Sequence, residues 1–314
     1  MTQQTKPTIQ RRTIYVKSKA CLIVLLISAL VAAFSTAAYP KETRRSLSVR
    51  PSAAAMLLPA TALSELRARA AMEDKGQFKL VYTPIKDHEL AHIEKMIKDS
   101  HLFERLVDDS NKHLALPVDI SVIFKECNGR DEDPTNAFYT PDNHSITLCY
   151  GLIKKSEELF KDDEKTAKDL EEAVLGSTAW TFYHEMGHAL IDVYKIAHTG
   201  KEEDAADELS TYILINEGGD EGEKAALSGA EDFYREASED NDLAEEQFAD
   251  VHSLNKQRFY NIICWVYGSN PEKYAYLTEG DEAILPQDRA ESCHDEYQRI
   301  AKAWPNLLGA HLKK

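Results

Sequence analysis

The chain contains the stretch HEMGH at residues 184–188 and, further along, the stretch EDAAD at residues 203–207. Residues four apart on a helix lie on one face, so His184 and His188 can direct a ring nitrogen toward one metal ion. Glu185 lies one step round the same turn, where it can act on a water molecule instead of binding the metal. The stretch therefore predicts a helix that carries a metal site, and this helix decides the fold that we expect.

A third ligand is expected from the second segment. The sequence HTGK at residues 198–201 is a good helix stop and turn, so a new helix from about residue 202 can fold back and bring Glu203 beside the histidines. Zinc with three protein ligands keeps a fourth position for water, whose pKa it lowers to about 7. We therefore expect one Zn²⁺ per chain, held by Glu203 and the two histidines, with Glu185 as the general base.

A second copy of the pattern, HELAH at residues 88–92, means that the motif alone does not decide where the metal binds. Lys95 and Asp99 follow its histidines by one or two turns, so those histidines are expected to face water, whereas the HEMGH helix is apolar nearly all round. Glu104 mimics the third-ligand spacing, but an uninterrupted helix would place it roughly 18 Å from His92. We assign the metal site to HEMGH.

These residues resemble the gluzincin pattern of zinc metallopeptidases. In that pattern the third ligand is a glutamate, as at Glu203, and an aspartate four residues further on steadies a histidine ligand, which implies this role for Asp207. More narrowly, the chain resembles a family of secreted metallopeptidases over about residues 78–308. The supporting segments are Cys127, residues 136–139, 146–150, 252–254 and 257–261, and Cys293 with Glu296 and Tyr297. The resemblance implies a zincin-like fold and a peptidase-like site, without a substrate.

Attack on a carbonyl creates an oxyanion, so a second donor beside the metal would help catalysis. His252 is the first candidate for this role, ahead of Arg258 and Tyr260. Each has an ordinary structural role as its alternative: a packed histidine, a salt bridge and a core tyrosine. Glu202 and Asp204 do not match the spacing of the pattern, and we interpret them as solvated charges at a helix start.

The pattern of apolar residues predicts an α+β fold, in which a small, mostly antiparallel sheet packs on helices. Strands are expected at residues 78–82, 118–124, 136–139 and 145–149, the last two forming a hairpin. Helices are expected at residues 87–111, 150–159, 165–194, 202–217, 243–267 and 286–307, and the acidic tract at residues 217–223 as a surface loop. A peptide could add a strand along residues 136–139; simple packing of the hairpin is the alternative.

Composition agrees with one sizeable soluble enzyme domain, which we place at residues 77–314. The 314 residues are 43% hydrophobic, enough to bury a full core. The formal net charge of -16 argues against broad binding to nucleic acid phosphates or anionic lipid. The oligomeric state does not follow from the sequence.

The N-terminus predicts export. Basic residues between positions 11 and 19 precede an apolar run at residues 20–38, which is the layout of a secretory signal. Residues 1–38 are therefore expected to be a signal peptide or, because the run is near the minimum for spanning a bilayer, an uncleaved anchor with the enzyme outside. Residues 39–76 are a flexible linker or a propeptide. We expect a secreted or periplasmic protein, attached to a membrane only through such an anchor.

Four cysteines remain once the signal segment is excluded, and an even number suits an oxidising destination. Three pairings are possible. We favour Cys127 with Cys149, because both lie at the ends of adjacent predicted strands, and Cys264 with Cys293, which would join the last two helical segments. Four buried free thiols are the alternative.

Two classes of function remain from these observations. The first is an exported zinc peptidase that acts on a peptide or protein substrate. The second is a catalytically weak or inactive metal-containing binding protein that presents an acidic surface to a partner. Glu185 favours the peptidase, because a structural zinc site needs no base and usually closes its fourth position with another protein ligand. Amide cleavage in cell-wall material is a third, weaker possibility.

Overall fold

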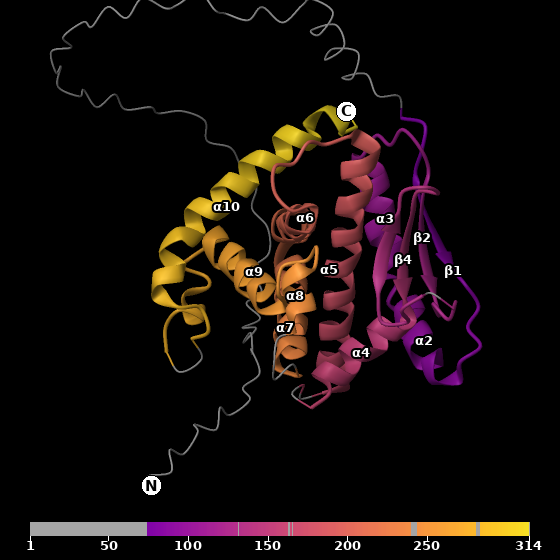
Figure 1. Ribbon diagram of the computed structural model, residues 1–314, viewed down its shortest axis with the longest axis horizontal. Helices are drawn as coiled ribbons and strands as arrows, with labels where there is room; N and C mark the ends of the chain where they lie inside the picture. Colours follow the sequence, from indigo (N-terminus) through magenta and orange to yellow (C-terminus); the bar gives the residue numbers. More distant parts are fainter. Residues whose placement is uncertain are drawn as a thin grey trace, which may run out of the picture. The chain divides into compact units, whose positions relative to one another are not determined.

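The computed structural model describes residues 74–130, 132–162, 164, 166–239, 244–280 and 283–313. The predicted signal segment, residues 1–38, lies outside the described residues, as does most of the predicted linker. Within the described ranges the chain forms an α+β fold with one small sheet and many helices, which confirms the predicted class. Figure 1 shows the helix α5 (Ala167–Tyr194) between the sheet on one side and further helices on the other.

The sheet has four strands in the spatial order β1 (Phe78–Tyr82), β2 (Ile120–Lys125), β4 (Ser145–Cys149) and β3 (Ala137–Thr140). The predicted hairpin is confirmed, because β3 pairs with β4 in the antiparallel direction. The other two pairings, β1 with β2 and β2 with β4, are parallel. The sheet is therefore mixed, and the expectation of mostly antiparallel pairing is corrected. The helices between β1 and β2 form a crossover connection, which allows the two strands to run in the same direction.

The helices follow the predicted order with some differences in their bounds. They are η1 (His88–Leu90), α2 (Ala91–Ser100), α3 (Leu102–His113), α4 (Tyr150–Phe160), α5, α6 (Glu202–Glu217), α7 (Gly219–Glu239), α8 (Glu245–Ala249), α9 (Asn255–Ser269), η2 (Ala275–Leu277), α10 (Gln287–Leu308) and η3 (Gly309–His311). The bounds of α6 are those predicted, and α5 begins two residues later than predicted and ends where predicted.

Three helical predictions were wrong. The helix expected at residues 87–111 is broken at His101, whose φ of 49° is left-handed and separates α2 from α3. The tract at residues 217–223 is not a loop: it runs from the end of α6 through Gly218 into the start of α7, whose first turn carries acidic side chains that suit a helix N-terminus. The helix expected at residues 243–267 is divided into α8 and α9. This last division matters for the site, because it leaves His252 on a loop.

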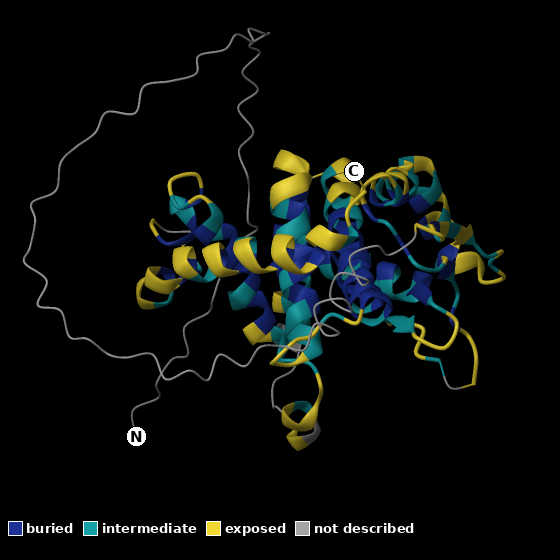
Figure 2. Ribbon diagram, turned by 90° about the horizontal axis from the view of Figure 1, so that it is seen from above, coloured by how far each residue is buried: buried dark blue, intermediate teal, exposed yellow. Residues whose placement is uncertain are grey.

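The hydrophobic core joins the sheet to α5. The ring of Phe103, on α3, lies 4.8 Å from that of Phe124 on β2 and 6.2 Å from that of Phe182 on α5, measured between centroids. All three side chains are fully buried. Figure 2 shows buried positions in the interior of the described body and exposed positions on the outer faces of its helices. The predicted burial of the HEMGH helix is confirmed, because most of α5 from Val174 onward is buried.

Small residues let the helices around α5 approach closely. A Cβ atom placed on Gly187 would lie 3.1 Å from the Cα atom of Ala206 on α6, and one on Gly229 of α7 would lie 2.4 Å from the ring of Trp180. A larger side chain at Gly187 would therefore separate α5 from α6. This close approach brings the start of α6 against the histidines of α5.

Both favoured cysteine pairings are confirmed. Cys127 pairs with Cys149 and Cys264 with Cys293, with Cα–Cα distances of 5.5 Å and 5.0 Å. Two disulfides fit an extracellular protein. None of the helices in the described part of the chain combines the length and the apolar character needed to cross a bilayer.

Candidate metal centre

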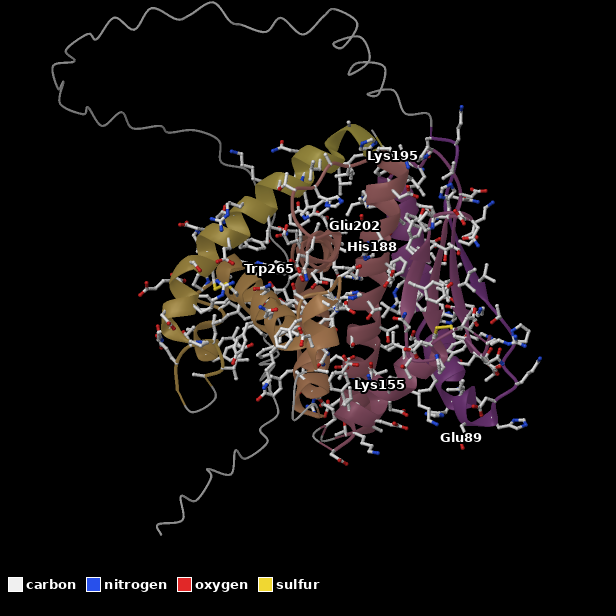
Figure 3. All side chains as sticks on the ribbon, in the orientation of Figure 1. Glu89, Lys155, His188, Lys195, Glu202 and Trp265 are labelled. Atoms are coloured by element: carbon white, nitrogen blue, oxygen red, sulfur yellow. A yellow bond between two sulfur atoms is a disulfide. The ribbon has the colours of Figure 1, made fainter. Side chains whose placement is uncertain are left out.

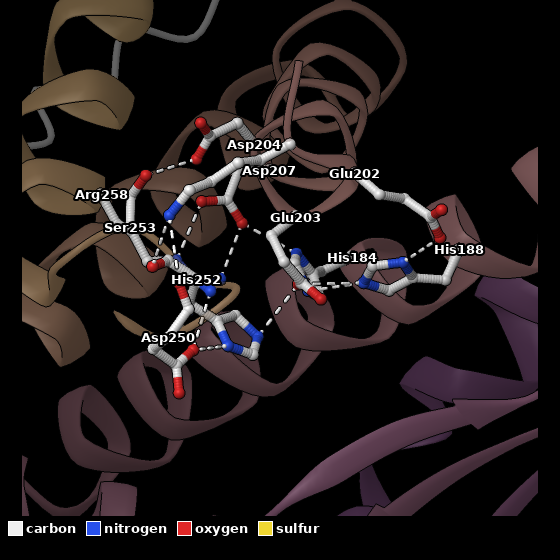
Figure 4. Close-up of polar contacts among 11 residues, drawn as sticks. His184, His188, Glu202, Glu203, Asp204, Asp207, Asp250, His252, Ser253 and Arg258 are labelled. Carbon is white, nitrogen blue, oxygen red and sulfur yellow. Dashed lines mark hydrogen bonds and ion pairs between the residues drawn. The ribbon is translucent and has the colours of Figure 1, made fainter. Parts of the chain in front are cut away.

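Three side chains from α5 and α6 converge on one point. The Nε2 atoms of His184 and His188 are 3.2 Å apart, and each lies 3.2 Å from Oε2 of Glu203. His184 is buried, and the other two are mostly buried. Figure 4 shows the two rings and the carboxylate facing one another between the helices. The residues predicted as ligands from their spacing are therefore brought together by the fold.

This group fits a tetrahedral metal ion. Two ligand atoms bound at about 2.0–2.1 Å to a tetrahedral zinc stand about 3.3 Å apart, close to the separations of these atoms. The electrostatics also suit a cation. Burial lowers the pKa of His188, but the hydrogen bond and charge of Glu203 and the nearby Glu185 and Glu202 outweigh it and raise that pKa to about 9. Surroundings that hold a proton on an imidazole also attract a divalent cation.

Asp207 lies behind His184, on the side away from the convergence point. Its Oδ1 is 2.8 Å from Nδ1 of His184, an ion-pair distance, although the contact does not have the geometry of a hydrogen bond. Arg258 donates two hydrogen bonds to the same carboxylate, at 2.9 Å and 2.7 Å. Burial raises the pKa of Asp207, but the charge of Arg258 and the contact with His184 hold it below its ordinary value. Asp207 is therefore a buried anion beside the ring of a candidate metal ligand.

Glu202 occupies the corresponding place behind His188. Its Oε1 lies 2.8 Å from Nδ1 of His188, and its Oε2 lies 3.4 Å from Nε2 of His198. The interpretation of Glu202 as merely a solvated charge is therefore wrong, even though its side chain is 42% exposed. Asp204 also has a partner, because it accepts a hydrogen bond of 2.7 Å from Ser253. Sequence spacing did not predict either contact, because His188 lies on α5 and Ser253 lies on the loop before α9.

His252 reaches the same convergence point from the loop between α8 and α9. Its Nε2 lies 2.9 Å from Oε2 of Glu203, and its Nδ1 lies 2.9 Å from Oδ1 of Asp250. Lys201 holds the loop by donating to the backbone carbonyl of His252 at 3.0 Å. The hydrogen bond to Glu203 outweighs burial and, with Asp250, raises the pKa of His252. Two carboxylates thus favour a ring with both nitrogens protonated, which is a donor and not a metal ligand.

Glu185 is buried beside these residues and lines a cleft of about 580 Å³. Burial raises the pKa of its carboxyl, while the charges of the two histidines lower it. The wall of the cleft comes from α5, α7, the α8–α9 segment and the start of β3, where Thr135, Asn136 and Ala137 contribute. β3 is an edge strand, so the predicted edge at residues 136–139 lies beside the cleft.

The remaining candidates for an oxyanion donor, Arg258 and Tyr260, have structural contacts. Arg258 lines the cleft, but both of the hydrogen bonds described above bind it to Asp207. Tyr260 packs against the core, with its ring 4.9 Å from that of Phe259. The contact of Asp250 with His252 was not predicted, although Asp250 lies only two residues before His252 in the sequence.

The HELAH copy at residues 88–92 does not form a comparable group. Nε2 of His92 lies 2.8 Å from a carboxylate oxygen of Glu157, and Glu104 accepts a hydrogen bond of 3.0 Å from Tyr82. Figure 3 shows Glu89 far from His188 and Glu202. Among the residues that the structure describes, the one group of metal-binding side chains is that of His184, His188 and Glu203. Because the helix is broken at His101, the distance expected for a continuous helix does not apply. The conclusion that Glu104 is not a third ligand is unchanged, because it contacts Tyr82.

Comparison with protein families agrees with this site. A family model described as "Putative metallopeptidase" matches residues 82–308, which include the whole candidate metal centre. The match covers well over half of the chain, and the chain belongs to this family. No curated protein and no solved structure matches the chain.

Proposed function

We propose that this protein is an exported zinc peptidase, with its catalytic domain at residues 77–314 and a signal peptide or anchor at residues 1–38. The observation that carries the proposal is the convergence of two imidazoles and one carboxylate beside a buried glutamate in a cleft. In this proposal His184, His188 and Glu203 hold one zinc ion. When bound, the ion would polarise a substrate carbonyl and make a water molecule more acidic.

The chain's own residues would then move the proton and stabilise the developing charge. Glu185 is the proposed general base, because it is buried beside the proposed metal ligands and burial raises the pKa of its carboxyl, which strengthens it as a proton acceptor. His252 is the proposed oxyanion donor, with Asp250 holding the far side of its ring. Asp207 would orient the ring of His184 through the Nδ1 contact, leaving Nε2 toward the metal.

The proposed substrate is an extended peptide segment that pairs with the edge of the sheet. Among the strands that the structure describes, β3 pairs only with β4, so its other side could accept the backbone of a peptide. The start of β3 and Glu185 line the same cleft, which would place a paired peptide near the base. This mode binds the backbone and therefore suits peptide or protein substrates of varied sequence.

The test compares Glu185→Gln with the unchanged protein, using bound metal and cleavage of a broad quenched-fluorescent peptide library as readouts. We expect about one zinc per chain in both proteins and a loss of hydrolysis of at least about a hundredfold in the variant. The matched control is Glu89→Gln, which changes the corresponding position of the HELAH copy and should alter neither readout. Equal cleavage by Glu185→Gln and the unchanged protein would show that the assigned mechanism is wrong.

The same measurements decide between a peptidase and a metal-containing binding protein. A zinc-loaded unchanged protein that cleaves no peptide would support the binding protein, for which the acidic surface is the expected contact. The presence of a base in the cleft favours the peptidase. Export is tested separately, by fractionating cells that express the full chain and sequencing the mature N-terminus; a protein that stays in the cytosol would contradict it.

A further inference from the structure

Arg258 is one of the most buried charged residues near the candidate metal centre, with an exposed fraction of 8%. We propose that Arg258 is a positioning residue: its planar guanidinium fixes the Asp207 carboxylate and, through it, the ring of His184 in the orientation that binds the metal. This inference rests on the proposed function and extends it to a residue that does not bind the ion.

The hydrogen bonds of Arg258 determine the plane of the carboxylate. Its Nε donates to Oδ2 of Asp207 at 2.9 Å, and its Nη2 donates to Oδ1 at 2.7 Å. Two parallel bonds of this kind fix orientation as well as position. Oδ1 is also the atom that lies 2.8 Å from Nδ1 of His184. A rotation of the carboxylate would therefore move the partner of the ligand ring.

Aromatic packing holds the guanidinium itself in place. The central carbon of the group lies 3.9 Å from the ring centroid of Phe233 and 5.5 Å from that of Trp180. The Trp180 ring in turn stacks on the ring of His184, with 5.5 Å between centroids and 22° between planes. Arg258 thus contacts two groups that themselves contact His184: the Asp207 carboxylate and the Trp180 ring.

The loop before α9 and the first turn of α9 contact α6 at three points around the metal centre. His252 contacts Glu203, Ser253 donates to Asp204, and Arg258 binds Asp207. The segment that supplies a wall of the cleft is therefore the same segment that orients the ligands. Figure 4 shows these residues on one side of the histidine pair. We infer that Arg258 links the placement of His252 in the cleft to the geometry of the ion.

The substitution Arg258→Lys distinguishes a role in orienting Asp207 from a role in neutralising its charge. Lysine keeps the positive charge beside Asp207 but is a point charge without the planar fork, so it cannot hold both oxygens in one plane. If Arg258 only neutralised Asp207, Arg258→Lys would preserve the metal site. If Arg258 positions the carboxylate, the lysine variant loses metal affinity although its charge is unchanged.

The experiment measures Zn²⁺ affinity by competition with a chelator and the visible absorption spectrum of the Co²⁺-loaded protein. Removing the support of a histidine ligand typically costs about tenfold to a hundredfold in metal affinity. We expect Arg258→Lys to lose affinity in that range and to show a changed cobalt spectrum, which reports ligand geometry. Unchanged affinity together with an unchanged spectrum would overturn the inference.

Arg235 provides a matched control. It pairs with Glu231, lies over the ring of Phe160 at 5.2 Å from the centroid, and has a side chain that is only 14% exposed. Arg235→Lys therefore disturbs a similarly packed arginine that contacts none of the proposed ligands. We expect its Zn²⁺ affinity and cobalt spectrum to match those of the unchanged protein.

A double-mutant cycle tests the route through Asp207. In an Asp207→Asn background, Arg258→Lys should cause little further loss of Zn²⁺ affinity, because the carboxylate that it positions is gone. A further loss as large as that in the unchanged background would overturn the inference. If Arg258→Lys does not fold, the neutral pair Asp207→Asn with Arg258→Gln replaces it and should match Asp207→Asn alone. An unchanged protein that binds no Zn²⁺ would instead refute the proposed function.

Discussion

Two carboxylates contact the far nitrogens of the two histidines, and they differ in burial. The side chain of Asp207 is 4% exposed and paired with Arg258, whereas that of Glu202 is 42% exposed. Water can replace a partner at an exposed position far more easily than at a buried one, and exposed ion pairs contribute little. The two carboxylates make the same kind of contact with a histidine ring, so we expect their difference in burial to decide how much each contributes to Zn²⁺ affinity.

We predict that Asp207→Asn lowers Zn²⁺ affinity about tenfold to a hundredfold, while Glu202→Gln lowers it by less than about fivefold. Chelator competition measures both, and circular dichroism checks that each variant is folded. A larger loss in Glu202→Gln than in Asp207→Asn would show that burial is not the deciding factor.

Asp232, on α7, predicts a pH dependence of stability. It is half-buried, and it accepts hydrogen bonds from the buried hydroxyls of Ser156, at 2.6 Å, and Ser177. Burial raises its pKa to about 6, and those hydrogen bonds only partly oppose the change. Because the folded-state pKa lies above the unfolded value of about 3.9, its contribution to stability is fully present below pH 4 and is lost as pH rises through 6.

Asp232→Asn should remove this dependence, since the amide does not titrate. We expect the free energy of unfolding of the variant, relative to the unchanged protein, to rise on the order of 2 kcal/mol between pH 4 and pH 7. Urea unfolding across this range measures it, with the exposed Asp142→Asn as control. Parallel pH profiles for Asp232→Asn and the unchanged protein would contradict the prediction.

At the scale of elements, the approach of α6 to α5 places Glu203 beside the histidines. A Cβ atom at Gly187 would already lie 3.1 Å from the Ala206 backbone. We predict that Gly187→Val costs about 1–3 kcal/mol of stability and weakens Zn²⁺ binding, because α6 must move outward. Thermal unfolding and chelator competition measure the two effects. Gly200→Val is the control, since a Cβ atom there meets nothing within 4 Å. Full metal affinity in Gly187→Val would show that Glu203 does not depend on this packing.

At the scale of the whole molecule, the two disulfides close segments of similar length, with sequence separations of 22 and 29 residues. The chain-entropy model gives each about 3–4 kcal/mol of stabilisation. Cys149 also contacts the segment before β3, because its backbone N–H donates to the carbonyl of Asn136 at 3.2 Å. The loop that lines the cleft is therefore attached to the sheet at this point.

We predict that replacing either pair with serines lowers the unfolding temperature by a similar amount. Only the loss of Cys127–Cys149 should also raise KM for a cleaved peptide, because the cleft-lining loop is released. Thermal unfolding and steady-state kinetics on the two double variants test this. Equal KM values in both variants would argue that the loop does not contact substrate.

Local features were predictable from the sequence because they depend on neighbouring residues. The spacing of His184 and His188 placed both on one helix face, and the HTGK turn gave the start of α6 at Glu202. The bounds of β1 and β4 are those predicted, and the alternating apolar residues of β2 predicted that strand to within two residues of its bounds. The break at His101 was missed because a non-glycine residue adopts a left-handed conformation there, and no Gly or Pro lies near it in the sequence.

What the sequence determined by itself was the identity of the three converging residues and of the buried helix that carries two of them, since helical periodicity is a short-range property. The tertiary structure alone decided the parallel direction of β1 and β2, the contacts of Glu202, and the meeting of Arg258 with Asp207 across 51 positions of sequence. These pairings and contacts depend on how separate elements pack. A charged group needs a protein partner only where that packing has excluded water from it.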